Sequence, residues 1–314
     1  MSQPAPSDIP EPLWNFWQPR YWLLWLGLGV MRLNALLPYR VQMAQGRQLG
    51  RLLYRLMPGR RRIAATNLRL CFPELDDVGQ NKLLKAHFAS LGMTVMEHGL
   101  AWWGSDALVR RLIDLRGQEH LERAMAGGRG VVLLTGHFGP QEFTGRAFGL
   151  ACPPAAGFYR PVRNPLVDEI LKRVRRKSAA ILIPKLALRQ VVRTLRSGMP
   201  LWYASDQSYR RAQSALIPFF GEPAMTSLAL SEICRLGKAV VVPLLPTRLS
   251  GDRGYRLEIL PALQNFPGES PEADARRVNA ILEDHIRMVP EQYYWLHRRF
   301  KGRPAPYPDP YLKS

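Results

Sequence analysis

The most constraining feature of the sequence is a continuous apolar run, Val131–Leu134, that ends at a glycine-flanked histidine. A run in which every residue is apolar is typical of a strand buried on both faces, as in a parallel sheet. Glycines on both sides let the chain turn sharply around His137, and Pro140 can open a helix that we expect to reach Leu150. His137 is therefore expected at the carboxyl end of a strand, where open α/β sheets bind ligands.

A carboxylate follows this histidine five positions later. Glu142 falls in the first turn of the expected helix, from which it is placed to reach back to the imidazole. A neutral imidazole is a general base near pH 7, and a carboxylate on its other nitrogen fixes the tautomer. Chance also produces this spacing in a chain of 314 residues. From the residues alone, a catalytic pair and a turn histidine satisfied by the backbone both remain open.

Other strand and helix patterns alternate along the chain. Strands are expected at 155–160, 179–184, 200–205, 239–249 and 255–260. Helices are expected at 76–96, 105–114, 118–126, 165–177, 186–197, 225–236 and 271–289. This alternation predicts an α/β fold with a mixed, mostly parallel sheet flanked by helices. If the sheet is parallel, Arg160 and Asp206, at the ends of two strands, converge with His137 on one edge.

The cysteines limit the possible chemistry. Cys71, Cys152 and Cys234 lie far apart and lack metal-ligand spacing. This pattern indicates buried free thiols in a reducing compartment, and we expect no metal site.

The charge of the chain points to an anionic partner. The formal net charge is +19, which favours nucleic acid, phospholipid or a phosphorylated substrate. From Pro12 to Pro73 there is no acidic residue, and Arg51 and Arg55 interleave with leucines in a helical stripe. This pattern is typical of an amphipathic segment on anionic lipid. A nucleic-acid-binding protein would also explain the charge, yet no recognisable binding motif is present, and nucleic acid is not the expected partner.

An apolar stretch, Tyr21–Tyr39, precedes the arginine stripe and is interrupted only at Arg32 and Asn34. Its length predicts an uncleaved membrane anchor that spans the bilayer or lies in the interface, with Trp22 and Trp25 as interfacial aromatics. A buried core helix is the alternative. The positive-inside rule places the rest of the protein on the cytoplasmic side. We expect a loose arm at 1–19, an anchor and arginine-rich segment at 20–73, and a catalytic domain at 74–314.

Five motifs occur in a fixed order along the chain. They are Gly136-His137-Phe138-Gly139-x-x-Glu142, Tyr159-Arg160-Pro161-x-x-Asn164-Pro165-Leu166-x-Asp168, Ala204-x-Asp206-Gln207, Pro218-Phe219-Phe220-Gly221-x-Pro223-Ala224-x-Thr226 and Pro290-Glu291-Gln292-Tyr293-x-Trp295-Leu296-His297-Arg298-Arg299-Phe300-Lys301. Over nearly its whole length the chain resembles the bacterial lipid A late acyltransferases, the lauroyl and myristoyl transferases of lipopolysaccharide assembly.

The resemblance implies a bacterial inner-membrane enzyme with a glycerol-phosphate-acyltransferase-like fold and a cytoplasmic active site. Its acyl donor would be acyl carrier protein, without a further cofactor, and its acceptor the hydroxyl of a 3-hydroxyacyl chain on a Kdo-bearing lipid A precursor. His137 and Glu142 correspond to the family's H-x-x-x-x-D/E motif. Arg160, Asn164, Arg175 and Asp206 would support substrate or transition state. Many members carry Asn-Trp where this chain has Pro140-Gln141, which affects the local pocket shape.

The expected mechanism is direct transfer of the acyl group. His137 removes the hydroxyl proton, Glu142 orients the imidazole, and backbone N–H groups near Gly139 or a nearby arginine hold the oxyanion. A basic group, Arg298, Arg299 and Lys301, provides docking candidates, with a solvated patch as the alternative. We expect lauroyl as the donor chain. Myristoyl transfer and a glycerol-phosphate-type phospholipid acyltransferase are the alternatives.

Overall fold

The computed structural model describes residues 11–159, 161–184, 187–208 and 213–312. The α-helices are α1 (Trp22–Asn34), α2 (Tyr39–Leu56), α3 (Pro58–Cys71), α4 (Asp77–Trp103), α5 (Asp106–Leu112), α6 (Gln118–Ala126), α7 (Gln141–Ala151), α8 (Pro165–Arg175), α9 (Leu188–Arg196), α10 (Ala229–Gly237) and α11 (Pro271–Met288). The strands are β1 (Ile113–Arg116), β2 (Gly130–Thr135), β3 (Ala156–Tyr159), β4 (Ile181–Pro184), β5 (Leu201–Ala204), β6 (Ser214–Phe219), β7 (Glu222–Ser227), β8 (Ala239–Arg248) and β9 (Tyr255–Ile259).

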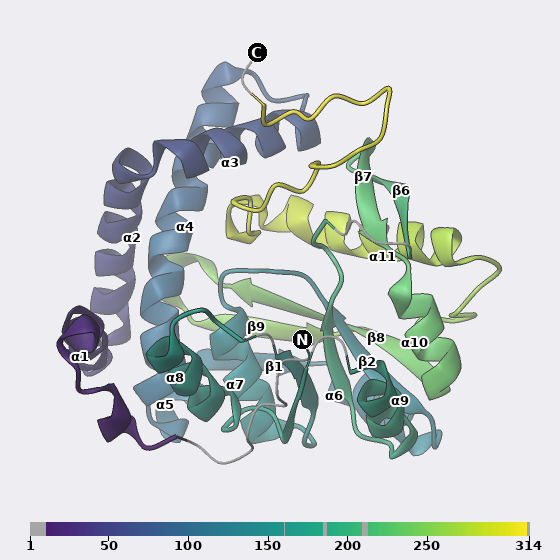
Figure 1. The fold of residues 1–314 in the computed structure, drawn as a ribbon, viewed down its shortest axis with the longest axis horizontal. Coiled ribbons are helices and arrows are strands. Elements are labelled where there is room, and N and C mark those ends of the chain that lie inside the picture. Colours follow the sequence, from purple (N-terminus) through teal and green to yellow (C-terminus); the bar gives the residue numbers. More distant parts are fainter. Residues whose placement is uncertain (1–10, 160, 185–186, 209–212, 313–314) are drawn as a thin grey trace.

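The described strands form one seven-stranded sheet and one separate hairpin. The order in the large sheet is β1-β9-β8-β2-β5-β3-β4. All neighbouring pairs are parallel except β8 and β9, which are antiparallel. The predicted mixed, mostly parallel sheet flanked by helices is therefore confirmed (Figure 1).

Strand β2 lies inside the sheet and is buried along its whole length. Val132 and Leu134 pack in a core shared with α9, α10 and α11. Val131 and Leu133 point to the opposite face, into a core shared with α6 and α7. Successive strand residues face opposite sides of the sheet, so helices on both faces require the unbroken apolar run from which the fold was predicted.

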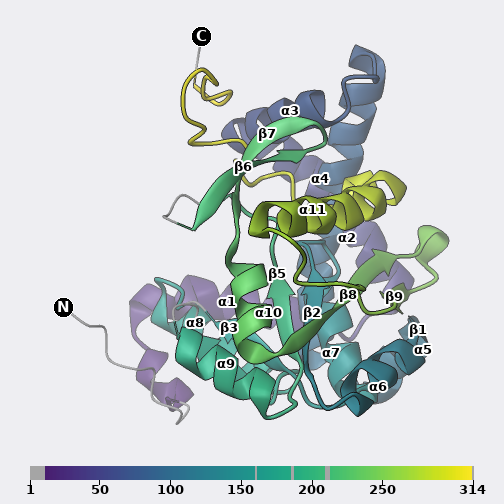
Figure 2. The same cartoon turned by 90° about the vertical axis from the view of Figure 1, so that its right-hand side faces the viewer.

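The hairpin β6–β7 lies where the sequence pattern predicted the start of a helix at 225. Only two residues, Phe220 and Gly221, connect its strands, and both have positive φ. A two-residue loop of this kind matches the right-handed twist of a hairpin. The helix predicted at 225–236 begins only at Ala229, because the preceding residues pair as β7. The hairpin packs beside α11 (Figure 2).

A helical layer covers one side of the molecule, where α2 and α4 run side by side (Figure 1). The two backbones approach closely: a Cβ added to Gly50 would lie 2.1 Å from the carbonyl oxygen of Phe88. In α3, Ala64 and Leu68 belong to the same core as Val132 of β2. Helices α2 and α3, from the arginine-rich segment, are thus packed against the α/β part of the chain.

The apolar stretch near the N-terminus forms the 13-residue helix α1, which ends at Asn34. At 1.5 Å per residue such a helix is about 20 Å long, whereas a bilayer core is about 30 Å thick. Among the residues described, no helix has the length and apolar content that a membrane span requires. Of the two predicted placements of the anchor, a helix that spans the bilayer is not found in the described part of the chain, because the chain turns at Pro38 and starts the amphipathic helix α2. The interfacial placement stays a prediction.

Candidate active site

The parallel pairing of β2 with β5 brings His137 and Asp206 together. Thr135 lies opposite Ala204, and the two candidate residues each follow two positions later. The Nδ1 of His137 is 2.6 Å from Oδ1 of Asp206, and its backbone N–H donates to Oδ2 at 2.9 Å. The prediction that these two residues converge on one sheet edge is confirmed. Arg160, predicted to join them, lies outside the described residues.

Asp206 is buried beside the more accessible imidazole. The carboxylate residue is 1% exposed, whereas the His137 side chain is 34% exposed. Burial alone would raise the pKa of Asp206, but the charge of His137 and hydrogen bonds from its ring and backbone lower that pKa well below its usual range. The carboxylate is therefore ionised at neutral pH and fixes the ring nitrogen that faces it.

Glu142 has a different partner from the one that the sequence predicted. Its Oε1 accepts hydrogen bonds from Arg175, at 2.6 Å from the terminal nitrogen and 3.2 Å from Nε. Glu142 lies in the first turn of α7 and meets α8 there, while Asp206 comes from the neighbouring strand at the level of the imidazole. Asp206 is therefore the carboxylate that contacts Nδ1 of His137, in the place that the sequence predicted for Glu142, and the catalytic role of Glu142 stays a prediction. Strand register, which the five-residue spacing does not reveal, decides between them.

The backbone around Gly139 is also engaged. The Gly139 N–H donates to the carbonyl oxygen of Gln292 at 2.8 Å, and the Tyr294 N–H donates to the carbonyl oxygen of His137 at 2.9 Å. The Gly139 amide is therefore already used within the protein. The predicted oxyanion donors, backbone N–H groups near Gly139 or a nearby arginine, stay a prediction.

The Tyr159 to Asp168 motif shapes the loop before α8. The Asn164 side chain accepts hydrogen bonds from the backbone N–H groups of Leu166 and Val167, as an N-cap does. Asp168 accepts from the Tyr159 hydroxyl and from the Val162 backbone. Both side chains fix the loop and the start of the helix that carries Arg175. The predicted contribution of Asn164 to substrate binding stays a prediction.

Much of the C-terminal motif is buried in the protein. One of the three predicted docking residues, Arg299, is therefore wrong as a docking candidate. Arg299 is 1% exposed and donates to Met225 O at 2.9 Å and to Thr226 Oγ1 at 2.8 Å. It ties the C-terminal segment to β7 and is not available to a partner. Arg298 is exposed over the ring of Tyr311, and Lys301 is half-buried.

A further histidine of this motif, which was not selected from the sequence, supports the loop after Asp206. His297 accepts a hydrogen bond from the Ser208 backbone N–H through Nε2 at 3.0 Å. Burial lowers the pKa of His297 to about 4, so the ring is neutral and able to accept this bond at pH 7. The sequence motif identified the segment that contains His297. Only the fold shows that this histidine binds the loop after Asp206.

The cysteines have the environment of structural thiols. All three are free, with Cys71 and Cys234 buried and Cys152 half-buried. Burial raises the pKa of Cys234 to about 12 and that of Cys152 to about 11, which disfavours the nucleophilic thiolate. Among the residues that the structure describes, no group of three or more His, Cys, Asp or Glu side chains is placed to hold a metal ion.

A histidine held by a buried aspartate at the carboxyl edge of a parallel sheet is suited to deprotonating a substrate hydroxyl. Residues 9–302 match the family described as bacterial lipid A biosynthesis acyltransferase. The chain belongs to this family, and it is an acyltransferase of lipopolysaccharide biosynthesis.

Individual relatives differ in the acyl group that they are named for. The lipid A biosynthesis lauroyltransferase of Escherichia coli (strain K12) is 38% identical over 306 residues, covering 97% of this chain and 100% of that protein. The palmitoleoyltransferase of the same organism is also 38% identical, over 93% of this chain and 95% of that protein. The myristoyltransferase of that organism is 27% identical, over 98% of this chain and 95% of that protein. By sequence identity, this chain is less similar to the myristoyltransferase than to the other two relatives, and it is equally similar to those two.

One solved structure has a weakly similar fold. The 1-acyl-sn-glycerophosphate acyltransferase of Thermotoga maritima aligns with a TM-score of 0.40 and 10% identity, over 82% of this chain and 100% of that one. These values are too low to support a conclusion about the site.

Proposed function

We propose that this acyltransferase moves a lauroyl group from acyl carrier protein to the hydroxyl of a 3-hydroxyacyl chain on a Kdo-bearing lipid A precursor. The observation that carries the proposal is the pairing of His137 with buried Asp206 at 2.6 Å, in a chain of the lipid A acyltransferase family. The product is an acyloxyacyl ester.

In this mechanism His137 acts as the general base. Its Nδ1–H donates to Asp206, so Nε2 takes the proton of the acceptor hydroxyl. The oxygen attacks the thioester carbonyl, the tetrahedral intermediate collapses with cleavage of the C–S bond, and the imidazolium returns its proton to the leaving thiolate. The negative charge of Asp206 stabilises the imidazolium between these steps. General-base catalysis of this type contributes about 100-fold to 10,000-fold.

Arg175 is the proposed cation of the site. Its side chain is about one-third exposed, and its guanidinium is held by Glu142 at 2.6 Å. A guanidinium fixed on one side by a carboxylate presents its remaining N–H groups in a defined direction. We assign it to the oxyanion or to an anionic group of the acceptor, and we assign Glu142 to holding it.

An acidic donor protein and a phosphorylated acceptor fit the surplus of positive charge. Helix α9 carries Arg189, Arg193 and Arg196 on its exposed face and contains no acidic residue. Arg298 is exposed as well. Acyl carrier protein is strongly acidic, so such surfaces would steer it to the enzyme.

We further propose that α1 lies in the cytoplasmic interface of the bacterial inner membrane. Leu23 is 80%, Leu26 64% and Trp22 60% exposed, which is unusual for side chains of this type. On α2, exposed Arg51 and Arg55 stand near exposed leucines. Apolar side chains together with arginines suit the boundary between acyl chains and anionic headgroups. Trp25 is half-buried, and its Nε1 donates to Phe16 O at 2.8 Å.

The deciding assay offers the purified enzyme lauroyl, palmitoleoyl and myristoyl thioesters of acyl carrier protein in competition. The acceptor is either Kdo-bearing lipid A precursor or lysophosphatidic acid. We expect acyloxyacyl product from the lipid A precursor, with lauroyl preferred. Turnover only with lysophosphatidic acid would refute the acceptor, and preference for another chain would refute the donor length. His137→Ala should abolish transfer, and near-normal turnover by this variant would exclude the general-base mechanism.

A further inference from the structure

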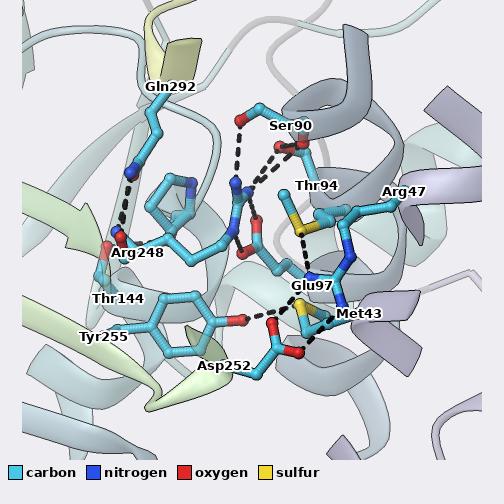
Figure 3. A network of polar contacts seen from close by, with 12 residues as sticks. Met43, Arg47, Ser90, Thr94, Glu97, Thr144, Arg248, Asp252, Tyr255 and Gln292 are labelled. Carbon is cyan, nitrogen blue, oxygen red and sulfur yellow. Dashed lines mark hydrogen bonds and ion pairs between the residues drawn. The ribbon is translucent and has the colours of Figure 1, made fainter. Parts of the chain in front are cut away.

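A buried ion pair, Glu97–Arg248, lies beside the catalytic turn, residues 136–140, which carries His137. Figure 3 shows the pair and its polar neighbours. Arg248, at the end of β8, binds Glu97 of α4 through two guanidinium nitrogens, one of them at 2.7 Å from Oε2. A further nitrogen donates to the hydroxyl of Ser90 at 2.8 Å. A buried arginine with a bidentate carboxylate partner has little freedom to move, since each displacement exposes an unpaired charge to a low-dielectric interior.

The backbone of Arg248 is in turn bound by one side-chain amide. Its N–H donates to Oε1 of Gln292 at 2.7 Å, and its carbonyl oxygen accepts from Nε2 of Gln292 at 3.0 Å. Figure 3 shows this amide extending toward the Arg248 backbone. Gln292 is therefore fixed by two hydrogen bonds to a residue that is itself fixed by the ion pair.

Gln292 contacts the catalytic turn through its own backbone. Its carbonyl oxygen accepts the Gly139 N–H at 2.8 Å, and two residues further on the Tyr294 N–H donates to the carbonyl oxygen of His137 at 2.9 Å. Phe138, between the two bonded turn residues, forms an isolated antiparallel bridge with Tyr293. The turn that carries the base is thus held against the segment after α11.

Gly139 of the turn also lies very close to α4 and to the side chain of Arg248. A Cβ at this position would lie 2.5 Å from Oγ1 of Thr94 and 3.1 Å from a terminal nitrogen of Arg248. A side chain at 139 has no space unless the network or the turn moves. The turn therefore rests directly on α4 and on the buried arginine.

We propose that Gln292 is a positioning residue for the transfer reaction: anchored by the Glu97–Arg248 pair, it fixes the turn that presents His137. The role rests on the proposed function of His137 as the base. Gln292 is buried and acts through the backbone of the turn, so its loss displaces the base without removing a substrate contact.

The test replaces Gln292 by Met, which keeps the length of the side chain. The substitution removes the two amide hydrogen bonds to the Arg248 backbone and a third, to Oε1 of Glu291 at 3.2 Å. We expect kcat to fall about 10-fold to 100-fold with KM changed less than about twofold, because small misplacements of a catalytic group cost this much. Asn279→Leu is the matched control. Asn279 is also buried, and its side-chain amide donates to the backbone oxygen of Pro218 in β6, which is not part of the turn. The Asn279→Leu substitution should lower the melting temperature to a similar extent as Gln292→Met and leave kcat within about twofold of wild type.

Hydrogen exchange gives a readout that does not depend on turnover. In Gln292→Met, amides of the 136–142 segment should exchange faster than in wild type, and in Asn279→Leu they should not. If wild type itself shows no transfer, the proposed function fails, and the exchange data still test the positioning role. A folded Gln292→Met enzyme with wild-type kcat and unchanged exchange would overturn the inference, as would an equal loss of kcat in both variants.

A second pair of variants probes the close approach. Gly139→Ala should reduce kcat, and adding Thr94→Ala should restore part of the loss, because it removes the Oγ1 that the new Cβ would meet at 2.5 Å. Thr94→Ala alone is measured as the reference. If the double variant is no faster than Gly139→Ala, the turn does not rest on α4 in the way proposed.

Discussion

At the scale of single residues, the two carboxylates near His137 have different partners. Asp206 is buried and bonded to Nδ1, and Glu142 is half-buried and bonded to Arg175. A carboxylate on Nδ1 holds the imidazole in the tautomer with a basic Nε2. A carboxylate on an arginine instead balances and orients a cation. In the proposed mechanism the two acids therefore have different roles, and we expect them to respond differently to neutralisation.

We expect Asp206→Asn to reduce kcat about 1,000-fold or more, because an amide favours the wrong tautomer and does not balance the imidazolium. Glu142→Gln keeps an oxygen that can accept from Arg175, and the expected loss is about tenfold. Rates are measured by single turnover with acyl carrier protein thioester, and circular dichroism verifies folding. Equal damage from both substitutions in folded enzymes would contradict the separate roles.

The stability of the protein is expected to depend on pH through the buried residue His87. His87 is buried on α4; its Nδ1–H donates to Glu291 O at 3.2 Å, and its Nε2 is buried without a partner. Burial lowers the pKa of His87 to about 4, whereas an unfolded histidine has a pKa of about 6.5. Between these values the unfolded chain binds more protons, so the free energy of unfolding decreases as pH falls through this range.

Through His87, the free energy of unfolding decreases by about 2 kcal/mol between pH 7 and pH 5. Urea unfolding of wild type and His87→Gln at both pH values measures it. The variant should lose about 2 kcal/mol less than wild type over this interval. His297 titrates in the same direction in both proteins and cancels in the comparison. An identical pH dependence in the two proteins would contradict the buried neutral state.

At the scale of elements, helix α1 is the clearest unpartnered surface. We expect Leu23→Glu with Leu26→Glu to reduce binding to vesicles containing anionic lipid by at least about tenfold, because two exposed apolar side chains become charged and repelled. The measurement is vesicle sedimentation. Val78→Glu with Met288→Glu is the matched control, since both side chains are exposed apolar residues outside α1. Equal binding by the two double variants would contradict an interfacial α1.

Sequence patterns determined most elements but not all of them. The strand Val131–Leu134 and the helix 118–126 were predicted where β2 and α6 lie, because their apolar periodicity is complete within each segment. Strand β1 was missed: it follows α5 directly, and its four residues, Ile113–Arg116, alternate with charges and resemble the end of a helix. The hairpin β6–β7 was missed because two prolines and a short loop obscure its alternation.

At the scale of the whole molecule, positive charge dominates. With a net charge of +19, we expect kcat/KM for an acyl carrier protein thioester to fall about tenfold or more between 50 mM and 500 mM salt, since steering is screened over a Debye length. The matched donor is the corresponding acyl-pantetheine, which lacks the acidic protein and should change less than about twofold. A parallel decline for both donors would show that salt acts on the enzyme or the acceptor.

The sequence by itself determined the fold class, the position of His137 at a strand end and the resemblance to an acyltransferase family. These properties depend on local periodicity and on short motifs, and both can be read along the chain. Tertiary structure decided which carboxylate meets the imidazole, because strand register places Asp206 there across a gap of 69 residues in sequence. It also placed Arg299 in the interior and the Glu97–Arg248 pair beside the turn. Such contacts join residues that carry no local signal for one another, and only packing brings them together.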